Sequence, residues 1–143
     1  EARAAVDGIA HVTVDSVVGD DLLEKGLRGL HAVGRTAMVP PRIVVLDYNP
    51  PGADGTVALV GKGLVYDTGG LSLKIVGDRM LTMKCDMGGA AAVLGAFVVL
   101  ARRGCTKRVL AILSMAENAI GSNAYRPDDV LDALAQFQAY PSQ

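Results

Sequence analysis

Lysines, aspartates and glycines gather in two neighbouring segments of the chain. The first, VGKGLVYDTGGLSLK, covers residues 60–74 and contains Lys62, Asp67 and Lys74, and the second, MKCDMGGAAAVLG, contains Asp86. Carboxylates bind divalent cations, and an amine can join them once burial beside a dication has removed its proton. We therefore predict a metal site with Lys62, Asp67 and Asp86 as candidate ligands. Lys74, kept charged, would polarise a substrate carbonyl.

The glycine-rich segment also raises a phosphate-binding alternative, which its spacing does not support. A Walker A loop requires a glycine where Thr56 stands and a serine or threonine where Gly63 stands. No G-x-G-x-x-G opens the helix expected after this strand, as a dinucleotide-binding turn requires. Nucleotide binding is therefore not expected.

The metal hypothesis requires Lys62 and Asp67 to lie on one side of a strand. They are five positions apart, which places them on opposite faces of an unbroken strand. Gly63 could host a β-bulge that returns them to one side. Simpler roles stay open for each residue: an Asx turn for Asp67, a helix cap for Asp86, and solvated strand-end charges for the lysines.

Hydrophobic patterning predicts strands that alternate with helices. We expect strands at residues 10–14, 42–48, 56–66 and 107–117, and helices at 19–37 and 88–103. Asp21 and Glu24 have the spacing of a capping box at the first helix. A strand, a long helix and a further strand imply a right-handed βαβ unit. The predicted fold class is α/β, with part of a mostly parallel sheet flanked by helices.

Composition and charge narrow the class of protein. The chain has 143 residues, of which 50% are hydrophobic, and a net charge of -1, so it can bury one core and shows no preference for nucleic acid or a membrane surface. Its longest apolar run, residues 90–101, is shorter than the roughly 20 residues that span a bilayer, and we expect a buried helix there. Two cysteines without a CxxC pair favour a reducing, cytoplasmic compartment, and no secretory signal is expected.

Consecutive segments of the chain resemble signature segments of the leucyl aminopeptidase family, the cytosolic dinuclear-metal aminopeptidases. They are VGKGLVYDTGGLSLK, MKCDMGGAAAVLG and AENAIGSNAYRPDDV. GLRGLHAVGRTAMVPPRIVVLDY is similar to the segment that precedes them in that family, so the likeness covers about residues 17–130. Within the family, the likeness is greatest to a branch of aminopeptidase-like members. It implies part of the catalytic domain of a leucyl aminopeptidase-like fold.

The resemblance also implies roles for the candidate residues. Lys62 and Asp86 would bind one of two divalent ions, zinc or manganese, and Asp67 would bridge both. Lys74 would be the electrophile beside the substrate carbonyl. The implied reaction is hydrolysis of the N-terminal residue of a peptide by a metal-activated hydroxide. The full-length family members are implied to be homo-hexamers.

The segment that follows in the family, N-T-D-A-E-G-R-L, is not among the 143 residues. By resemblance it supplies a further aspartate and glutamate ligand and an arginine that holds a bicarbonate base. We therefore expect residues 1–130 to be the N-terminal half of a catalytic domain and residues 131–143 to be a divergent tail. With its ligand set incomplete, the chain is expected to be inactive by itself. The alternative is a non-catalytic truncated product that at most associates with full-length subunits.

Overall fold

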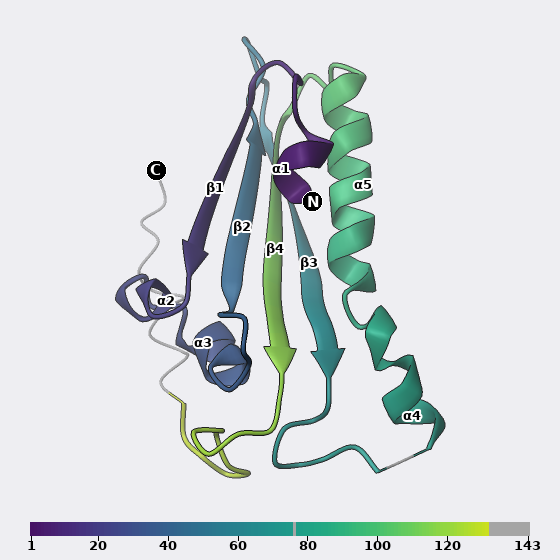
Figure 1. Cartoon of the computed structure of the whole chain (residues 1–143). Helices are drawn as coiled ribbons and strands as arrows, with labels where there is room; N and C mark the ends of the chain where they lie inside the picture. The colour runs from purple at the N-terminus through teal and green to yellow at the C-terminus, as the bar shows by residue number, and fades with distance from the viewer. Residues whose placement is uncertain (76, 132–143) are drawn as a thin grey trace.

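The computed structural model describes residues 1–75 and 77–131, which form a four-stranded sheet with helices packed against it (Figure 1). The strands are β1 (Val12–Val18), β2 (Arg42–Tyr48), β3 (Thr56–Asp67) and β4 (Arg108–Asn118). The helices are α1 (Ala2–Ala5), α2 (Asp21–Glu24), α3 (Arg28–Gly34), α4 (Asp78–Leu81), the 3-10 helix η1 (Thr82–Cys85) and α5 (Gly88–Arg102). The predicted α/β class is confirmed. The tail expected from residue 131 lies outside the described residues from residue 132 onward.

The strands follow the order β1-β2-β4-β3 across the sheet. β3 and β4 are parallel and α5 connects them, as the predicted βαβ unit requires. The prediction of a mostly parallel sheet is wrong for the described residues, because the pairs β1–β2 and β2–β4 are antiparallel. The connections explain this difference. α2 and α3 lie between the end of β1 and the start of β2, at one end of the sheet, so β2 runs opposite to β1 (Figure 1). The short connection from β2 to β3 reverses the chain again, so β3 and its parallel neighbour β4 run opposite to β2.

The first predicted helix is two short helices in the structure. α2 ends before Gly26, which has a φ of 74°, a left-handed conformation that interrupts a helix and is easiest for glycine. The chain then starts α3 at Arg28. The expected capping box is also wrong, because Asp20 is the N-cap residue of α2 and its side chain makes no capping hydrogen bond.

Helix α5 packs against the sheet along one stripe of its surface. Ala90, Phe97 and Ala101 are buried in the main apolar cluster, which also contains Val109 and Leu113 of β4. Phe97 is fully buried at 0% exposure. Val99, on another side of the helix, is 54% exposed. The expectation of a buried helix therefore holds for one stripe of α5 and not for its whole circumference.

The stretch from Thr82 to Arg102 has the length and the apolar composition of a membrane-spanning helix, with a mean hydropathy of 1.5. A single stretch of this kind is weak grounds for a membrane span, since a core helix of a soluble protein has the same properties. Its continuous α-helical part, α5, has 15 residues. At 1.5 Å per residue this part is about 22 Å long, which is less than the roughly 30 Å of a bilayer core.

Two glycines of β3 allow α5 and β4 to lie close to this strand. A Cβ atom on Gly61 would lie 2.7 Å from the Cα atom of Ala90 and 2.7 Å from the carbonyl oxygen of Gly89. A Cβ atom on Gly63 would lie 2.8 Å from Cγ of Met115. Larger residues would push the start of α5 away from the sheet. The glycines therefore place the segment just before α5 beside β3.

Candidate functional site

A β-bulge in β3 brings Lys62 and Asp67 to one side of the strand. Lys62 lies opposite Ser114 and Asp67 lies opposite Asn118 on β4, with a register shift between Leu64 and Tyr66. Because Ser114 and Asn118 are four residues apart, their partners on β3 fall on the same side. The predicted bulge is confirmed, but its predicted position at Gly63 is wrong.

Asp67 is the last residue of β3, and both of its carboxylate oxygens accept hydrogen bonds. Oδ1 accepts from the backbone N–H of Gly69 at 2.9 Å and from Nδ2 of Asn118 at 2.8 Å. Oδ2 lies 2.5 Å from Nζ of Lys74. The bond from Gly69 is an Asx turn, so the simpler role predicted for Asp67 is present together with the lysine contact. Its side chain is held from three directions.

The pKa of Asp67 is lower than the ordinary value of an aspartate. Burial disfavours the carboxylate and by itself raises the pKa. The hydrogen bonds from Lys74, Gly69 and Asn118, with the positive charge of Lys74, outweigh the effect of burial and lower the pKa. Asp67 is therefore a carboxylate at neutral pH, which is the form that binds a cation.

Lys62 and Asp86 form the second lysine–carboxylate pair. Nζ of Lys62 lies 2.8 Å from Oδ2 of Asp86, and the side chains are 55% and 18% exposed. The two atoms are close enough for an ion pair. Oδ2 is buried and accepts no hydrogen bond within the described part of the chain, so the contact lacks the angles of a hydrogen bond. The positive charge of Lys62 at this distance compensates the burial of the oxygen. A divalent ion could supply the same charge to Oδ2, so the group fits the predicted ligand role.

The alternative role of Asp86 as a helix cap is not supported by the start of α5. The N-cap residue of α5 is Met87, and no side chain donates or accepts a capping hydrogen bond there. Asp86 instead occupies the C-cap position of η1. Its carboxylate is directed to Lys62 rather than to the first turn of α5.

The contacts place the four predicted residues in two separate pairs. Lys74 is with Asp67, and Lys62 is with Asp86. Within residues 1–75 and 77–131, no group of three or more histidine, cysteine, aspartate or glutamate side chains gathers as a metal cage would require. Each candidate carboxylate is instead neutralised by a lysine. A bound dication would supply the positive charge that these lysines now supply.

Sequence reasoning missed Asn118, the last residue of β4. Its amide donates to Asp67, and its backbone carbonyl accepts from Oγ1 of Thr68 at 2.6 Å. The sequence did contain a signal that could have found it. β3 and β4 were both predicted, and parallel strands place their carboxyl ends at one edge of a sheet. A lone amide at the end of the second strand therefore had to lie near Asp67.

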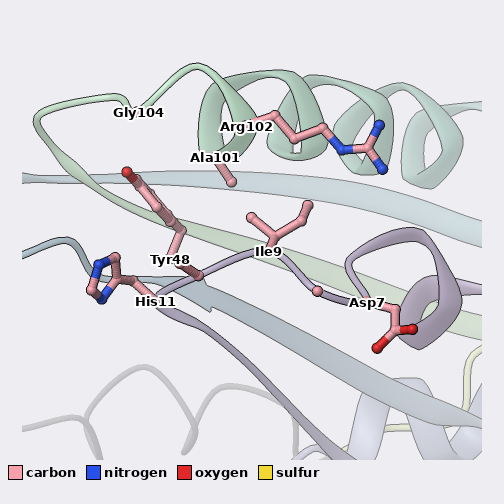
Figure 2. A pocket seen from close by; sticks show the side chains of 9 residues that line it. Asp7, Ile9, His11, Tyr48, Ala101, Arg102 and Gly104 are labelled. Carbon is pink, nitrogen blue, oxygen red and sulfur yellow. The ribbon is translucent and has the colours of Figure 1, made fainter.

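A hollow of the described surface lies at the opposite end of the sheet. It has a volume of about 450 Å³, and Asp7, His11, Tyr48 and Arg102 are among the residues that line it. Figure 2 shows His11 and Tyr48 on one side of this hollow, with the guanidinium of Arg102 and the carboxylate of Asp7 on the other. These four polar groups do not converge on a common point. The hollow therefore does not compete with Asp67 and Asp86 as the candidate site.

Comparison with known sequences identifies relatives of this chain. The sequence profile described as "Cytosol aminopeptidase family, catalytic domain" matches residues 1–138. The "Probable aminopeptidase NPEPL1" of Mus musculus is 47% identical over 119 residues, which are 83% of this chain and 22% of the mouse protein. The chain therefore spans about a fifth of the length of this relative.

Comparison with solved structures gives the same result. The structure of apo leucyl aminopeptidase from Trypanosoma cruzi is similar with a TM-score of 0.85 at 45% identity, over 91% of this chain and 25% of that protein. The bottromycin maturation enzyme BotP, solved in complex with Mn, has a TM-score of 0.84 at 45% identity, over 94% of this chain and 29% of that enzyme. These likenesses extend over most of the described fold.

Proposed function

The chain belongs to the cytosol aminopeptidase family, and from this membership we propose that it forms part of the catalytic domain of a metal-dependent aminopeptidase. The proposed reaction is hydrolysis of the N-terminal residue of a peptide. Lys62 and Asp86 would hold one divalent ion, zinc or manganese, and Asp67 would bridge it to a second. The observation that carries this proposal is that Asp67 and Asp86 each pair with a lysine, so both carboxylates favour a positive charge beside them.

The bound ions would supply Lewis-acid activation of the water that attacks the peptide carbonyl. The chain's own residues set up this chemistry. Asp67 stays ionised because its hydrogen bonds outweigh the effect of burial on its pKa. Lys62 acts as a ligand only after it has lost its proton, since an ammonium group has no lone pair to share. Asp86 offers the oxygen that accepts no hydrogen bond among the described residues.

Lys74 would have a second partner in this proposal. In the structure its Nζ atom lies 2.5 Å from Oδ2 of Asp67. With Oδ2 serving as a metal ligand, the Lys74 ammonium would be available to donate to the carbonyl oxygen of a substrate. Its side chain is 28% exposed, so it is within reach of a ligand at the surface. Its positive charge would stabilise the oxyanion that develops during attack.

The 143 residues supply only part of the proposed site. The N-T-D-A-E-G-R-L segment that follows in the family by resemblance is not among them, so its ligands and its arginine would have to come from elsewhere. On family membership we also propose that residues 1–130 are catalytic domain and residues 131–143 a divergent tail. Cytoplasmic location and hexameric assembly of the full-length protein are further proposals from the same membership.

Metal titration of the 143-residue chain tests the proposal. Calorimetry with zinc or manganese should detect one weak site, because Lys62, Asp67 and Asp86 are fewer than the roughly four ligands that zinc takes. Asp67→Ala should abolish this binding. Asp7→Ala, at the opposite end of the sheet, is the matched control and should bind as the unmutated chain does. Two tight sites would refute the weak single site, and binding that survives Asp67→Ala would remove Asp67 from the ligand set.

A further inference from the structure

Asn118 is the polar residue that is buried within the described part of the chain, at 7% exposure. A buried amide is costly unless its donors and acceptor find partners. Its Nδ2 atom donates to Oδ1 of Asp67 at 2.8 Å. Asn118 is not one of the predicted ligands, and its side chain reaches the candidate site only through this bond. The hydrogen bond to Asp67 is therefore the contact that compensates the cost of burying this amide.

The ends of β3 and β4 hold Asn118 in place. Its backbone carbonyl accepts from the N–H of Thr68 at 3.1 Å and from Oγ1 of the same threonine at 2.6 Å. Gly70, with a φ of 67°, approaches from the other side, and a Cβ atom there would lie 2.9 Å from Oδ1 of Asn118. The absent side chain of Gly70 thus leaves room for the amide oxygen. The hydrogen bonds to the Asn118 carbonyl and the close approach of Gly70 together limit the positions that the amide can take.

The two donors on Oδ1 set the direction of the Asp67 carboxylate. Gly69 and Asn118 both donate to Oδ1, whereas Oδ2 accepts from the ammonium of Lys74 within the described part of the chain. With Oδ1 occupied by fixed donors, Oδ2 is the oxygen that a cation can take when Lys74 leaves. Without the amide, Gly69 would be the remaining fixed donor to Oδ1, and the carboxylate could rotate more easily about its Cβ–Cγ bond.

We propose that Asn118 is a positioning residue that fixes the Asp67 carboxylate for cation binding through its Nδ2–Oδ1 hydrogen bond. This inference rests on the proposed function, since it assigns Asn118 to the same metal site. Groups that hydrogen-bond a metal ligand typically change metal affinity by about 10-fold to 100-fold when they are lost. In this proposal Asn118 acts through Asp67, to which its amide donates.

The first test is the zinc affinity of variants of the 143-residue chain. Asn118→Leu keeps the branching at Cγ and the number of side-chain heavy atoms but removes the donor, and the Kd for zinc should rise by about 10-fold to 100-fold. Thr36→Val is the matched control, because it removes a hydrogen bond of 2.6 Å to the carbonyl of Ala119, the residue after Asn118, and Thr36 is not one of the residues that hold Asp67 or Asn118. Its Kd should stay at the value of the unmutated chain. Circular dichroism checks that each variant is folded at the temperature of the titration.

A second measurement on the unmutated chain covers the case in which Asn118→Leu fails to fold. In a ¹⁵N NMR titration, the side-chain amide resonances of Asn118 should move with added zinc, and they should stay in place in Asp67→Ala. Such a movement shows that zinc binds at the carboxylate to which this amide donates. An unchanged Kd in Asn118→Leu, or amide resonances that stay still while zinc binds, overturns the inference and leaves the proposed metal site intact. Absence of zinc binding in the unmutated chain overturns both.

Discussion

The two ends of the sheet differ in how their polar side chains are held. At the end where β3 and β4 begin, a hollow of about 450 Å³ is lined by His11, Tyr48 and Arg102, whose polar groups point apart (Figure 2). At the end where these strands finish, Asp67 is held by Asn118, Gly69 and Lys74. The polar groups that line the hollow do not converge on one point, and the groups that do converge, at Asp67, lie outside it. Convergence is therefore the better guide to the candidate site in this chain.

Strand direction accounts for this difference. β3 and β4 are the parallel pair, and they end together at Asp67 and Asn118. Residues that follow or finish parallel strands meet at one edge, where groups from separate parts of the chain can act together. At the other end, the lining residues of the hollow come from the segment between α1 and β1, the end of β2, and the end of α5 with the turn after it. No shared edge forces their side chains to face each other.

The largest expected effect of a substitution is on catalysis at the carboxyl end of β3. In a full-length family member carrying this segment, Lys74→Ala should lower kcat by about 100-fold or more with a smaller change in KM, as the loss of an oxyanion donor does. Steady-state kinetics with a leucine amide substrate measures both constants. Arg102→Ala, at the hollow, is the control and should leave kcat unchanged.

The kinetic result has two outcomes that would alter the comparison. A change confined to KM in Lys74→Ala would assign this lysine to ground-state binding of the substrate. An equal loss of kcat in Arg102→Ala would show that the end with the hollow contributes to catalysis. In that case convergence of side chains would not distinguish the two ends.

The next largest effect concerns the packing that places Asp86 beside β3. Gly61→Ala would put a Cβ atom 2.7 Å from backbone atoms of Gly89 and Ala90, which cannot move independently of α5. We expect a loss of about 1–3 kcal/mol in the free energy of unfolding, which is typical of overpacking. Urea denaturation followed by circular dichroism measures it.

Gly95→Ala is the matched control for this substitution, because it lies in α5 and a Cβ atom there would meet nothing within 4 Å. It should stabilise the chain by about 0.5–1 kcal/mol, since alanine loses less backbone entropy in a helix than glycine does. If Gly61→Ala is as well tolerated as Gly95→Ala, the contact between β3 and α5 is not as tight as the structure has it.

Most of the elements could be predicted from sequence, because their signals are local. β2 was expected at residues 42–48 and is Arg42–Tyr48, and α5 was expected at 88–103 and is Gly88–Arg102. Strand direction could not be predicted in the same way. It depends on whether a connection crosses the sheet, and the helical pattern at residues 19–37 did not show that Gly26 divides it into two short helices at one end.

The candidate residues were predicted from their types, but their partners were not. The spacing of Lys62 and Asp67 required a bulge, and a bulge is present. The position of the bulge could not be predicted, because glycine occurs both at bulges and where other atoms approach the backbone closely. Gly63 lies at a close approach, to Met115. The bond from Asn118 to Asp67 joins residues 51 positions apart. Such a contact depends on strand pairing rather than on local spacing.

The smallest expected effect is the acid dependence of stability that Asp67 contributes. Its pKa is lowered in the folded chain, so the unfolded chain binds more protons as the pH falls toward the folded pKa. The stabilisation is thus fully present above the ordinary aspartate pKa of about 3.9 and is lost as the pH falls through the lower folded value. Thermal melts of the unmutated chain and of Asp67→Asn between pH 2 and pH 6 measure it, and the Asn variant should lose less stability in acid.

Lys74→Met should also reduce the acid dependence, because the hydrogen bond from Lys74 is the strongest of those that lower this pKa. Identical acid curves for all three chains would show that other carboxylates cause the acid sensitivity. Asp67 and Lys74 would then not be coupled electrostatically, and this difference between the two ends of the sheet would be lost.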